Sequence, residues 1–135
     1  MTRTAKCCCG QCAIEIDGEP NLNAVCHCDN CRRRTGSAFG WSVYFRDEQV
    51  RARSGPLTLY AFTPASGVGE QQRYFCAACG TTMFWTNTAA PGLTGMAAGC
   101  FAPHLLGPPT LSQLDGQRCA WVTLPDGVFI IGAAP

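Results

Sequence analysis

The chemistry of this chain is concentrated in its cysteines, of which there are 11 among 135 residues. Most of them fall into three tight clusters: Cys7, Cys8, Cys9 and Cys12; Cys26, Cys28 and Cys31; and Cys76 and Cys79. Thiolate sulfur is a preferred ligand of zinc, and a structural zinc site is closed by four protein ligands in a tetrahedron. The short spacers between these cysteines therefore predict metal binding.

The cysteine count and the start of the chain argue against a disulfide framework. A secreted disulfide-rich chain normally has an even number of cysteines and a signal peptide with an apolar core of about 7–15 residues. The first residues, MTRTAKCCCGQC, contain no such core, and no apolar run reaches the roughly 18 residues of a membrane span. We therefore expect a cytoplasmic protein without membrane segments, whose thiols are reduced and free to bind metal.

The pair Cys76 and Cys79, followed by Gly80, has the spacing of half a zinc site. Its two-residue spacer forms a tight turn that directs both sulfurs to one point about 2.3 Å away. Glycine then allows the positive φ that such a turn needs. Two further ligands are required to close the tetrahedron.

The first cluster can supply these two ligands in more than one way. Cys7 and Cys9 are favoured, because residues i and i+2 of an extended segment point to the same side. Cys9 and Cys12 form the rival pair, since their spacing is also that of a tight turn. Cys12 alternates with two isoleucines, however, which favours a place in the core.

The middle cluster supplies three thiolates, from Cys26, Cys28 and Cys31. In an extended segment His27 points to the opposite side from its two neighbours, so we expect a surface or core histidine and not a fourth ligand. A vacant fourth position is typical of catalytic zinc. The alternative is a site closed by a distant side chain, for which the candidates are Cys100, Cys119 and His104. Cys100 and Cys119 are otherwise interpreted as small buried residues in strands.

Three thiolates also indicate which chemistry the open position would support. They leave the zinc site with a net negative charge and make it a weak Lewis acid, and soft ligands suit a further sulfur donor. The expected reaction is thiol activation. Arg32, Arg33 and Arg34 follow the cluster directly and could bind the carboxylates of a substrate with two-pronged hydrogen bonds.

Short strands with frequent turns are expected to position these clusters. Alternating apolar residues predict strands at 12–17 and 39–46, and further short strands are expected at 57–62, 71–76, 81–86, 96–101 and 118–124. Residues 128–131 follow a Pro-Asp-Gly turn, which favours a hairpin. The only expected helix is a turn or two at 30–35, ended by Gly36. Loops are expected near 63–70, 87–95 and 102–110.

Composition agrees with one globular domain over residues 1–135. Hydrophobic residues make up 47% of the chain and charged residues 14%, which excludes a disordered protein. A net charge of +1 without a basic stripe does not favour nucleic-acid binding. The oligomeric state is not indicated by any pattern.

Four ordered motifs resemble those of the glutathione-dependent formaldehyde-activating enzyme family, also called the Gfa/CENP-V domain. They are CCCG at 7–10, CHCDNCR at 26–32, TGSAFG at 35–40 and FCAACGT at 75–81, and the likeness runs over about residues 5–128. The resemblance implies an Mss4-like fold, a small mainly β domain of short antiparallel strands with two zinc sites. Its implied structural zinc ligands are Cys7, Cys9, Cys76 and Cys79, and its implied catalytic zinc ligands are Cys26, Cys28 and Cys31.

The resemblance also implies a reaction and its substrates. That reaction is addition of glutathione to formaldehyde to give S-hydroxymethylglutathione, or the reverse, which makes the enzyme a carbon–sulfur lyase. Two alternatives remain open. One is a non-catalytic module that binds a thiol or a protein, and the other is a purely structural scaffold with two zinc ions, which predicts a fourth protein ligand at the second site.

Overall fold

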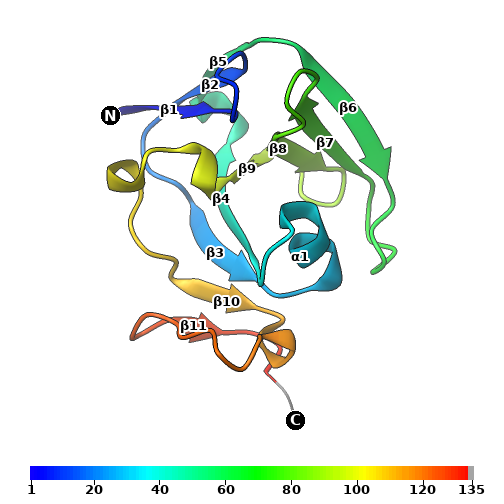
Figure 1. Cartoon of the computed structure of the whole chain (residues 1–135), viewed down its shortest axis with the longest axis vertical. Helices are drawn as coiled ribbons and strands as arrows, with labels where there is room; N and C mark the ends of the chain where they lie inside the picture. Colours follow the sequence, from blue (N-terminus) through cyan, green and yellow to red (C-terminus); the bar gives the residue numbers. More distant parts are fainter. Residues whose placement is uncertain (134–135) are drawn as a thin grey trace.

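The computed structural model describes residues 1–133 of the chain, which form two β-sheets and one short α-helix (Figure 1). The small sheet consists of β1 (Thr2–Lys6), β2 (Ala13–Asp17) and β5 (Val50–Ser54), in the order β1-β2-β5. The large sheet consists of β3 (Leu22–Cys26), β4 (Gly40–Arg46), β6 (Leu57–Phe62), β7 (Gln71–Cys76), β8 (Thr82–Asn87), β9 (Leu93–Ala97), β10 (Leu111–Gln113) and β11 (Phe129–Ile130). The prediction of a mainly β fold is confirmed.

The order of the large sheet is β11-β10-β3-β4-β9-β8-β7-β6, so the strands that carry the cysteine clusters lie well apart in it. All its pairs are antiparallel except those of β10, which runs parallel to both β3 and β11. The chain begins in the small sheet and reaches β11 at the opposite end of the molecule (Figure 1). Four short 3-10 turns occupy Asp47–Gln49, Ala98–Cys100, Pro103–Leu105 and Asp115–Gln117.

The core fills the space between the small sheet and one face of β4, β8 and β9. Alternate residues of these strands point inward and are almost completely buried: Ile14 and Ile16 on β2, Val43 and Phe45 on β4, Phe84 on β8 and Met96 on β9. Each such side chain contributes roughly 1.5–3 kcal/mol by leaving water. The opposite face of the large sheet is therefore free to carry a functional site.

The helix α1 (Asp29–Thr35) begins and ends where the sequence predicts. The side chain of Cys28 caps its first turn by accepting a hydrogen bond from the amide of Cys31, 3.4 Å away. Asp29 in the first turn and three arginines in the last turn suit the helix dipole. Gly36 ends the helix with a φ of 63°, the left-handed conformation that glycine adopts without strain.

Several sequence predictions of the strands are wrong. Residues 96–101 continue β9 only as far as Ala97 and then form a 3-10 turn. Residues 118–124 form no strand, and consequently Cys100 and Cys119 both lie outside strands, half-buried. Residues 128–131 do not pair back across the preceding turn, because Phe129 and Ile130 run parallel to β10.

Four strands have no sequence signal strong enough to predict them: β1, β3, β5 and β10. In β1 the inward positions are held by Ala5 and by Arg3, whose guanidinium donates a hydrogen bond to the carbonyl of Leu105, 2.8 Å away. A buried arginine with polar partners breaks the expected apolar alternation.

Among the described residues, no helix has the length and apolar character needed to cross a membrane.

Candidate metal centres and active site

Four sulfurs, two from the first cysteine cluster and two from the third, lie together beside the small sheet. The sulfur atoms of Cys7, Cys9, Cys76 and Cys79 all lie within 4.8 Å of one another. Cys9 Sγ is 3.6 Å from Cys7 Sγ and 3.8 Å from Cys76 Sγ. Four sulfurs placed about 2.3 Å from a central ion define a tetrahedron with edges of about 3.8 Å. The group therefore fits a closed, four-thiolate metal site.

Two tight turns bring these sulfurs together. The amide of Gly10 donates to the carbonyl of Cys7, 3.1 Å away, and the amide of Gly80 donates to the carbonyl of Cys76, 2.8 Å away. Both glycines have a φ of 79°. Cys7 and Cys9 thus approach each other across a turn. The expectation that residues 7–9 are extended is wrong, although the same two cysteines come together.

Cys12 lies in the core beneath this group and does not join it. Its side chain is fully buried, and burial raises the pKa of its thiol to about 12. Its amide donates a hydrogen bond to Cys7 Sγ, 3.2 Å away, a backbone contact that favours the thiolate form of the ligand. The prediction that Cys12 faces the core is confirmed.

Thr81 supports the group from the outer side. Its hydroxyl lies 3.2 Å from Cys79 Sγ and accepts a hydrogen bond from the amide of Cys8, 3.1 Å away. The hydrogen bond with Thr81 lowers the pKa of Cys79 to about 5. Cys8 itself is exposed, in keeping with a side chain directed away from the other three cysteines of its cluster.

The second group contains the sulfurs of Cys26, Cys28 and Cys31, again all within 4.8 Å of one another. Cys26 ends β3, Cys28 caps α1 and Cys31 lies one turn further along the helix. Contact with the Cys31 thiol lowers the pKa of Cys26 to about 6, and the same contact raises the pKa of Cys31. Cys26 is therefore the more readily ionised of these two thiols.

Within the described part of the chain, no fourth metal-binding side chain completes this second group. His27 points away from it, as predicted, and is fully buried with Nε2 2.9 Å from the hydroxyl of Ser112. Burial lowers the pKa of His27. Cys100, Cys119 and His104 also lie outside the group, so the alternative of closure by a distant side chain has no donor among the described residues.

The glycine that begins β4 allows α1 to pack closely over the second group. Gly40 is the register partner of Cys26, so the two residues face the same side of the sheet. A Cβ atom added to Gly40 would lie 2.8 Å from Arg34 Nη2, 3.0 Å from Cys31 Cβ and 3.5 Å from Cys31 Sγ. The helix, the sulfur of Cys31 and the guanidinium of Arg34 therefore share the space that a side chain would occupy.

The first two of the three consecutive arginines both lie close to Asp29. Arg32 pairs with Asp29 and donates a hydrogen bond from Nε to the carbonyl of His27, 3.1 Å away. Arg33 is 82% exposed and lies 3.7 Å from the same aspartate. Both contacts stabilise the helix, and the predicted binding of substrate by these two residues gains no support from their positions.

Arg34 has different surroundings and lies beside the second cysteine group. Its Cζ stands 4.7 Å from the centroid of the Trp85 ring. Its Nη2 is buried and has no hydrogen-bond partner among the described residues. The positive charge of Arg34 near the cysteines contributes to the lowered pKa of Cys26.

A row of side chains across the free face of the large sheet forms the floor of this site. Register pairs place Arg73 of β7 opposite Trp85 of β8, Trp85 opposite Gly95 of β9, and Gly95 opposite Tyr44 of β4. The indole N–H of Trp85 donates to the hydroxyl of Tyr44, 3.2 Å away. Burial raises the pKa of Tyr44, which keeps its hydroxyl protonated.

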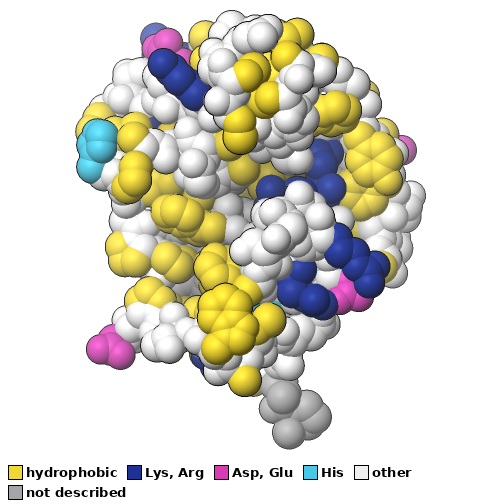
Figure 2. All heavy atoms as spheres, viewed as in Figure 1, with side chains coloured by type: hydrophobic (Ala, Val, Ile, Leu, Met, Phe, Trp, Pro, Cys, Tyr) yellow, Lys and Arg dark blue, Asp and Glu magenta, His cyan; other side chains and the backbone are white. Residues whose placement is uncertain are grey.

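The sequence analysis did not anticipate Trp85, Arg73 and Tyr44 as site residues. All three lie in strands predicted correctly, but strand prediction does not give the register that brings them together. The one available signal was an arginine inside the segment 71–76, which was expected to be a strand. Basic side chains gather around α1 and toward β6 and β7, as Figure 2 shows.

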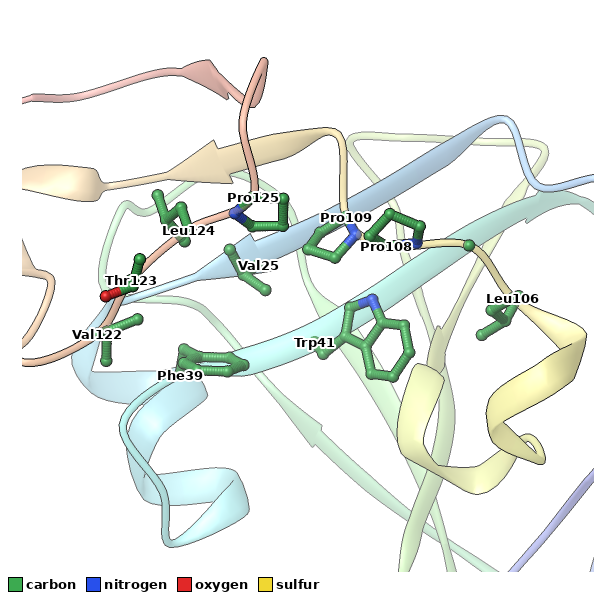
Figure 3. A pocket seen from close by; sticks show the side chains of 11 residues that line it. Val25, Phe39, Trp41, Leu106, Pro108, Pro109, Val122, Thr123, Leu124 and Pro125 are labelled. Carbon is green, nitrogen blue, oxygen red and sulfur yellow. The ribbon is translucent and has the colours of Figure 1, made fainter.

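A separate apolar hollow of about 300 Å³ lies on the other face of β3 and β4 (Figure 3). Val25 and Trp41 are register partners that point into it, and Phe39 lies beside them. Pro108, Pro109 and Leu124 close its far side. The neighbouring pair, Cys26 and Gly40, faces the opposite way, so the two strands separate this hollow from the cysteines.

A mainly β fold with two groups of cysteines, each able to hold a metal ion, defines a class of metal-binding domain. Within that class the chain belongs to the family described as glutathione-dependent formaldehyde-activating enzyme, whose model matches residues 2–114. A crystal structure of a Rhodobacter sphaeroides protein is similar in fold, with a TM-score of 0.58 and 24% identity over 79% of this chain and 95% of that chain. None of the curated proteins compared with the chain matches it.

Proposed function

We propose that this chain is a zinc enzyme that adds a thiol to a small aldehyde, or cleaves the resulting adduct. The observation that carries the proposal is the group of Cys26, Cys28 and Cys31, which has no fourth donor among the described residues and lies near Arg34. Membership of the formaldehyde-activating family supports glutathione and formaldehyde as the substrates. The reduced thiols favour a cytoplasmic location.

Both cysteine groups suit zinc by the chemistry of their donors. All seven side chains offer thiolate sulfur, which zinc binds readily, and the measured distances in the first group match a tetrahedron. We assign Cys7, Cys9, Cys76 and Cys79 to a structural zinc and Cys26, Cys28 and Cys31 to a catalytic one. When bound, the catalytic zinc would supply an electrophilic site that favours the thiolate form of the substrate.

The chain's own residues would bind the charged groups of the substrate and hold it in position. In the addition, the substrate sulfur forms a bond to the aldehyde carbon, the carbon–oxygen π bond breaks, and the proton lost by the thiol ends on the oxygen. The guanidinium of Arg34, close to Cys31, can attract the negative charge of the substrate. Trp85 lies against the Arg34 guanidinium and limits the positions that it can take, which favours a fixed placement of the substrate.

Two-dimensional exchange NMR tests the proposal directly. Addition of formaldehyde to glutathione also proceeds without enzyme, so the measured quantity is the rate of exchange between the adduct and free glutathione. We expect the zinc-loaded chain to accelerate this exchange and Cys31→Ser to lose the acceleration. Cys8→Ser is the matched control, because Cys8 is exposed and lies outside both groups. Two bound zinc ions without any acceleration or glutathione binding would contradict the proposal.

A further inference from the structure

A network of polar side chains connects the last part of the sequence to the edge of the second cysteine group. His27 separates the first two cysteines of that group, and its Nε2 lies 2.9 Å from the hydroxyl of Ser112 on β10. That hydroxyl donates to Oδ1 of Asp115, 2.8 Å away, and Nε of Arg118 lies 3.1 Å from the same oxygen. His27 and Ser112 are both fully buried. The proposed reaction does not use any of these side chains.

The donors in this network determine which nitrogen of His27 carries the proton. A serine hydroxyl has a single hydrogen, and that of Ser112 goes to the carboxylate of Asp115, which as an ion can only accept. The same hydroxyl must accept from His27, so the ring proton lies on Nε2. Nδ1 is then an acceptor, buried and without a partner among the described residues. The opposite tautomer would leave a buried N–H unpaired at Nδ1 and two acceptors facing each other at Ser112.

His27 is held at its backbone as well as at its ring. Its amide donates to the carbonyl of Gln113 on β10, 3.2 Å away, and its carbonyl accepts from Nε of Arg32 on α1, 3.1 Å away. The preceding Cys26 is the register partner of Gln113 in the parallel pair of β3 and β10. In a cysteine one rotatable bond separates the backbone from the sulfur, and it is confined to a few rotamers. The backbone on either side of His27 therefore sets where two of the three sulfurs lie.

The turn that brings Asp115 back to Ser112 has a strained backbone. Leu114 has a φ of 50°, and within residues 1–133 no other residue except glycine has a positive φ. This left-handed conformation is rare and unfavourable for a leucine. The amide of Asp115 donates to the carbonyl of Ile131, 3.1 Å away, which fastens the turn from the side of β11. Strain of this kind persists where the surrounding structure holds it, and it is concentrated at functional sites.

We propose that Ser112, Asp115 and Arg118 are positioning residues for the second cysteine group. By holding the ring of His27, they set the placement of two of its sulfurs around a metal ion. The inference rests on one part of the proposed function, the binding of a metal ion by this group. Loss of an outer partner that orients metal ligands typically costs about 10–100-fold in metal affinity. Asp115 and Arg118 lie beyond residues 2–114, the part of the chain that matches the family.

Cadmium NMR tests the inference, because each bound cadmium ion gives its own resonance and the position of that resonance depends on the geometry of the ligands. The sample is the full chain loaded with cadmium in place of zinc. Cys31→Ser identifies the resonance of the second group as the one that it loses. In Ser112→Ala this resonance should shift or broaden, while the resonance of the first group stays in place. The zinc affinity of the second group, measured by competition with a chromophoric chelator, should fall about 10–100-fold.

Thr94→Val is the matched control. Thr94 is also fully buried and donates its hydroxyl to an aspartate, Asp47, 2.8 Å away, but it lies on β9 outside both cysteine groups. This variant should lose stability in urea denaturation, as Ser112→Ala does, and leave both resonances in place.

Asp115 provides a pair of variants that also decides the inference if Ser112→Ala does not fold. Asp115→Ala should shift the second resonance, because the hydroxyl of Ser112 loses its acceptor. Asp115→Asn keeps an oxygen acceptor in the same place and should restore most of the original position of the resonance.

The outcomes separate this inference from the proposed function. If Ser112→Ala and Asp115→Ala are folded and keep the second resonance and the zinc affinity, the positioning role is overturned and the proposed reaction stands. If the second resonance shifts but the unmodified protein does not accelerate glutathione exchange, the positioning role is supported and the proposed function is contradicted. A chain that binds only one cadmium ion overturns both, since there would be no second ion to position.

Discussion

Trp85 of β8 and Tyr44 of β4 are in direct contact, although strand β9 lies between their strands. The contact passes over Gly95 of β9. The indole N–H of Trp85 donates to the hydroxyl of Tyr44, 3.2 Å away, and the two rings are nearly perpendicular, at 78°. A Cβ atom on Gly95 would overlap Trp85 Nε1 and lie 2.8 Å from Tyr44 Cε1. The absence of one side chain therefore creates the floor on which Arg34 rests.

Gly95→Ala should break this contact and shift the Trp85 ring. We expect a loss of about 1–3 kcal/mol in the free energy of unfolding, the usual cost of overpacking a tight site. Urea denaturation followed by tryptophan fluorescence measures it. Gly99→Ala is the control, because a Cβ added at Gly99 meets nothing within 4 Å. Equal stability of the two variants would show that the site tolerates a methyl group.

The two cysteine groups should differ in what their loss does to the fold. Cys76 is fully buried and joins β7 to the hairpin at the start of the chain, so Cys76→Ser should unfold or aggregate the protein. Cys31→Ser should keep the fold, and zinc content measured by atomic absorption should fall from about two ions per chain to about one. Retention of both ions in Cys31→Ser would disprove the assignment.

Cys12→Ala should leave both zinc ions bound, because the Cys12 sulfur is not one of the four grouped sulfurs and the amide that donates to Cys7 Sγ is kept. A small loss of stability, about 1 kcal/mol, is expected from the buried sulfur that is removed. Cys9→Ala should instead lose one zinc ion, since its sulfur lies 3.6 Å from that of Cys7. Loss of a zinc ion in both variants would instead favour the rival pair of Cys9 and Cys12. Zinc content and urea denaturation give both readouts.

Cys100 should react slowly with alkylating reagents at neutral pH. Burial raises the pKa of its thiol to about 11, and only the thiolate is nucleophilic. Below that pKa the thiolate fraction grows about tenfold per pH unit, so the labelling rate should rise steadily from pH 7 to pH 10. An ordinary thiol with a pKa of about 8.5 would instead reach a plateau.

Iodoacetamide labelling of the zinc-loaded protein, with peptide mass spectrometry, measures the rate at Cys100 itself. At pH 7 we expect it to be at least about a hundredfold below that of an ordinary exposed cysteine. Cys100→Ser identifies the labelled peptide, and the exposed Cys8 serves as an internal reference. A plateau near pH 9 would contradict the raised pKa.

The sequence alone was sufficient to identify features that depend on neighbouring residues. The cysteine spacings, the glycine after Cys79 and the helix that ends at Gly36 all follow from local geometry. Strands β2, β4, β6, β7 and β8 were predictable because their apolar residues alternate or cluster between turns. The roles of the cysteines as zinc ligands remain predictions of this kind.

Weakly patterned segments were not predictable, because their partners decide their conformation. The strand β10 has three residues and forms by adding in parallel to β3, with β11 beside it in turn. Residues 118–124 are as apolar as many strands but form none. Short segments take the conformation that their neighbours can pair with, and neighbours distant in sequence are invisible to a local pattern.

Only the tertiary structure decided which neighbours each arginine of α1 has. The three arginines of α1 have one sequence signal in common, yet Arg32 and Arg33 turn to Asp29 while Arg34 turns to Trp85. Arg73 joins Arg34 because the register of β7 against β8 sets it opposite Trp85. Composition and spacing determine which groups are available, whereas strand register and helix packing determine which of them face each other.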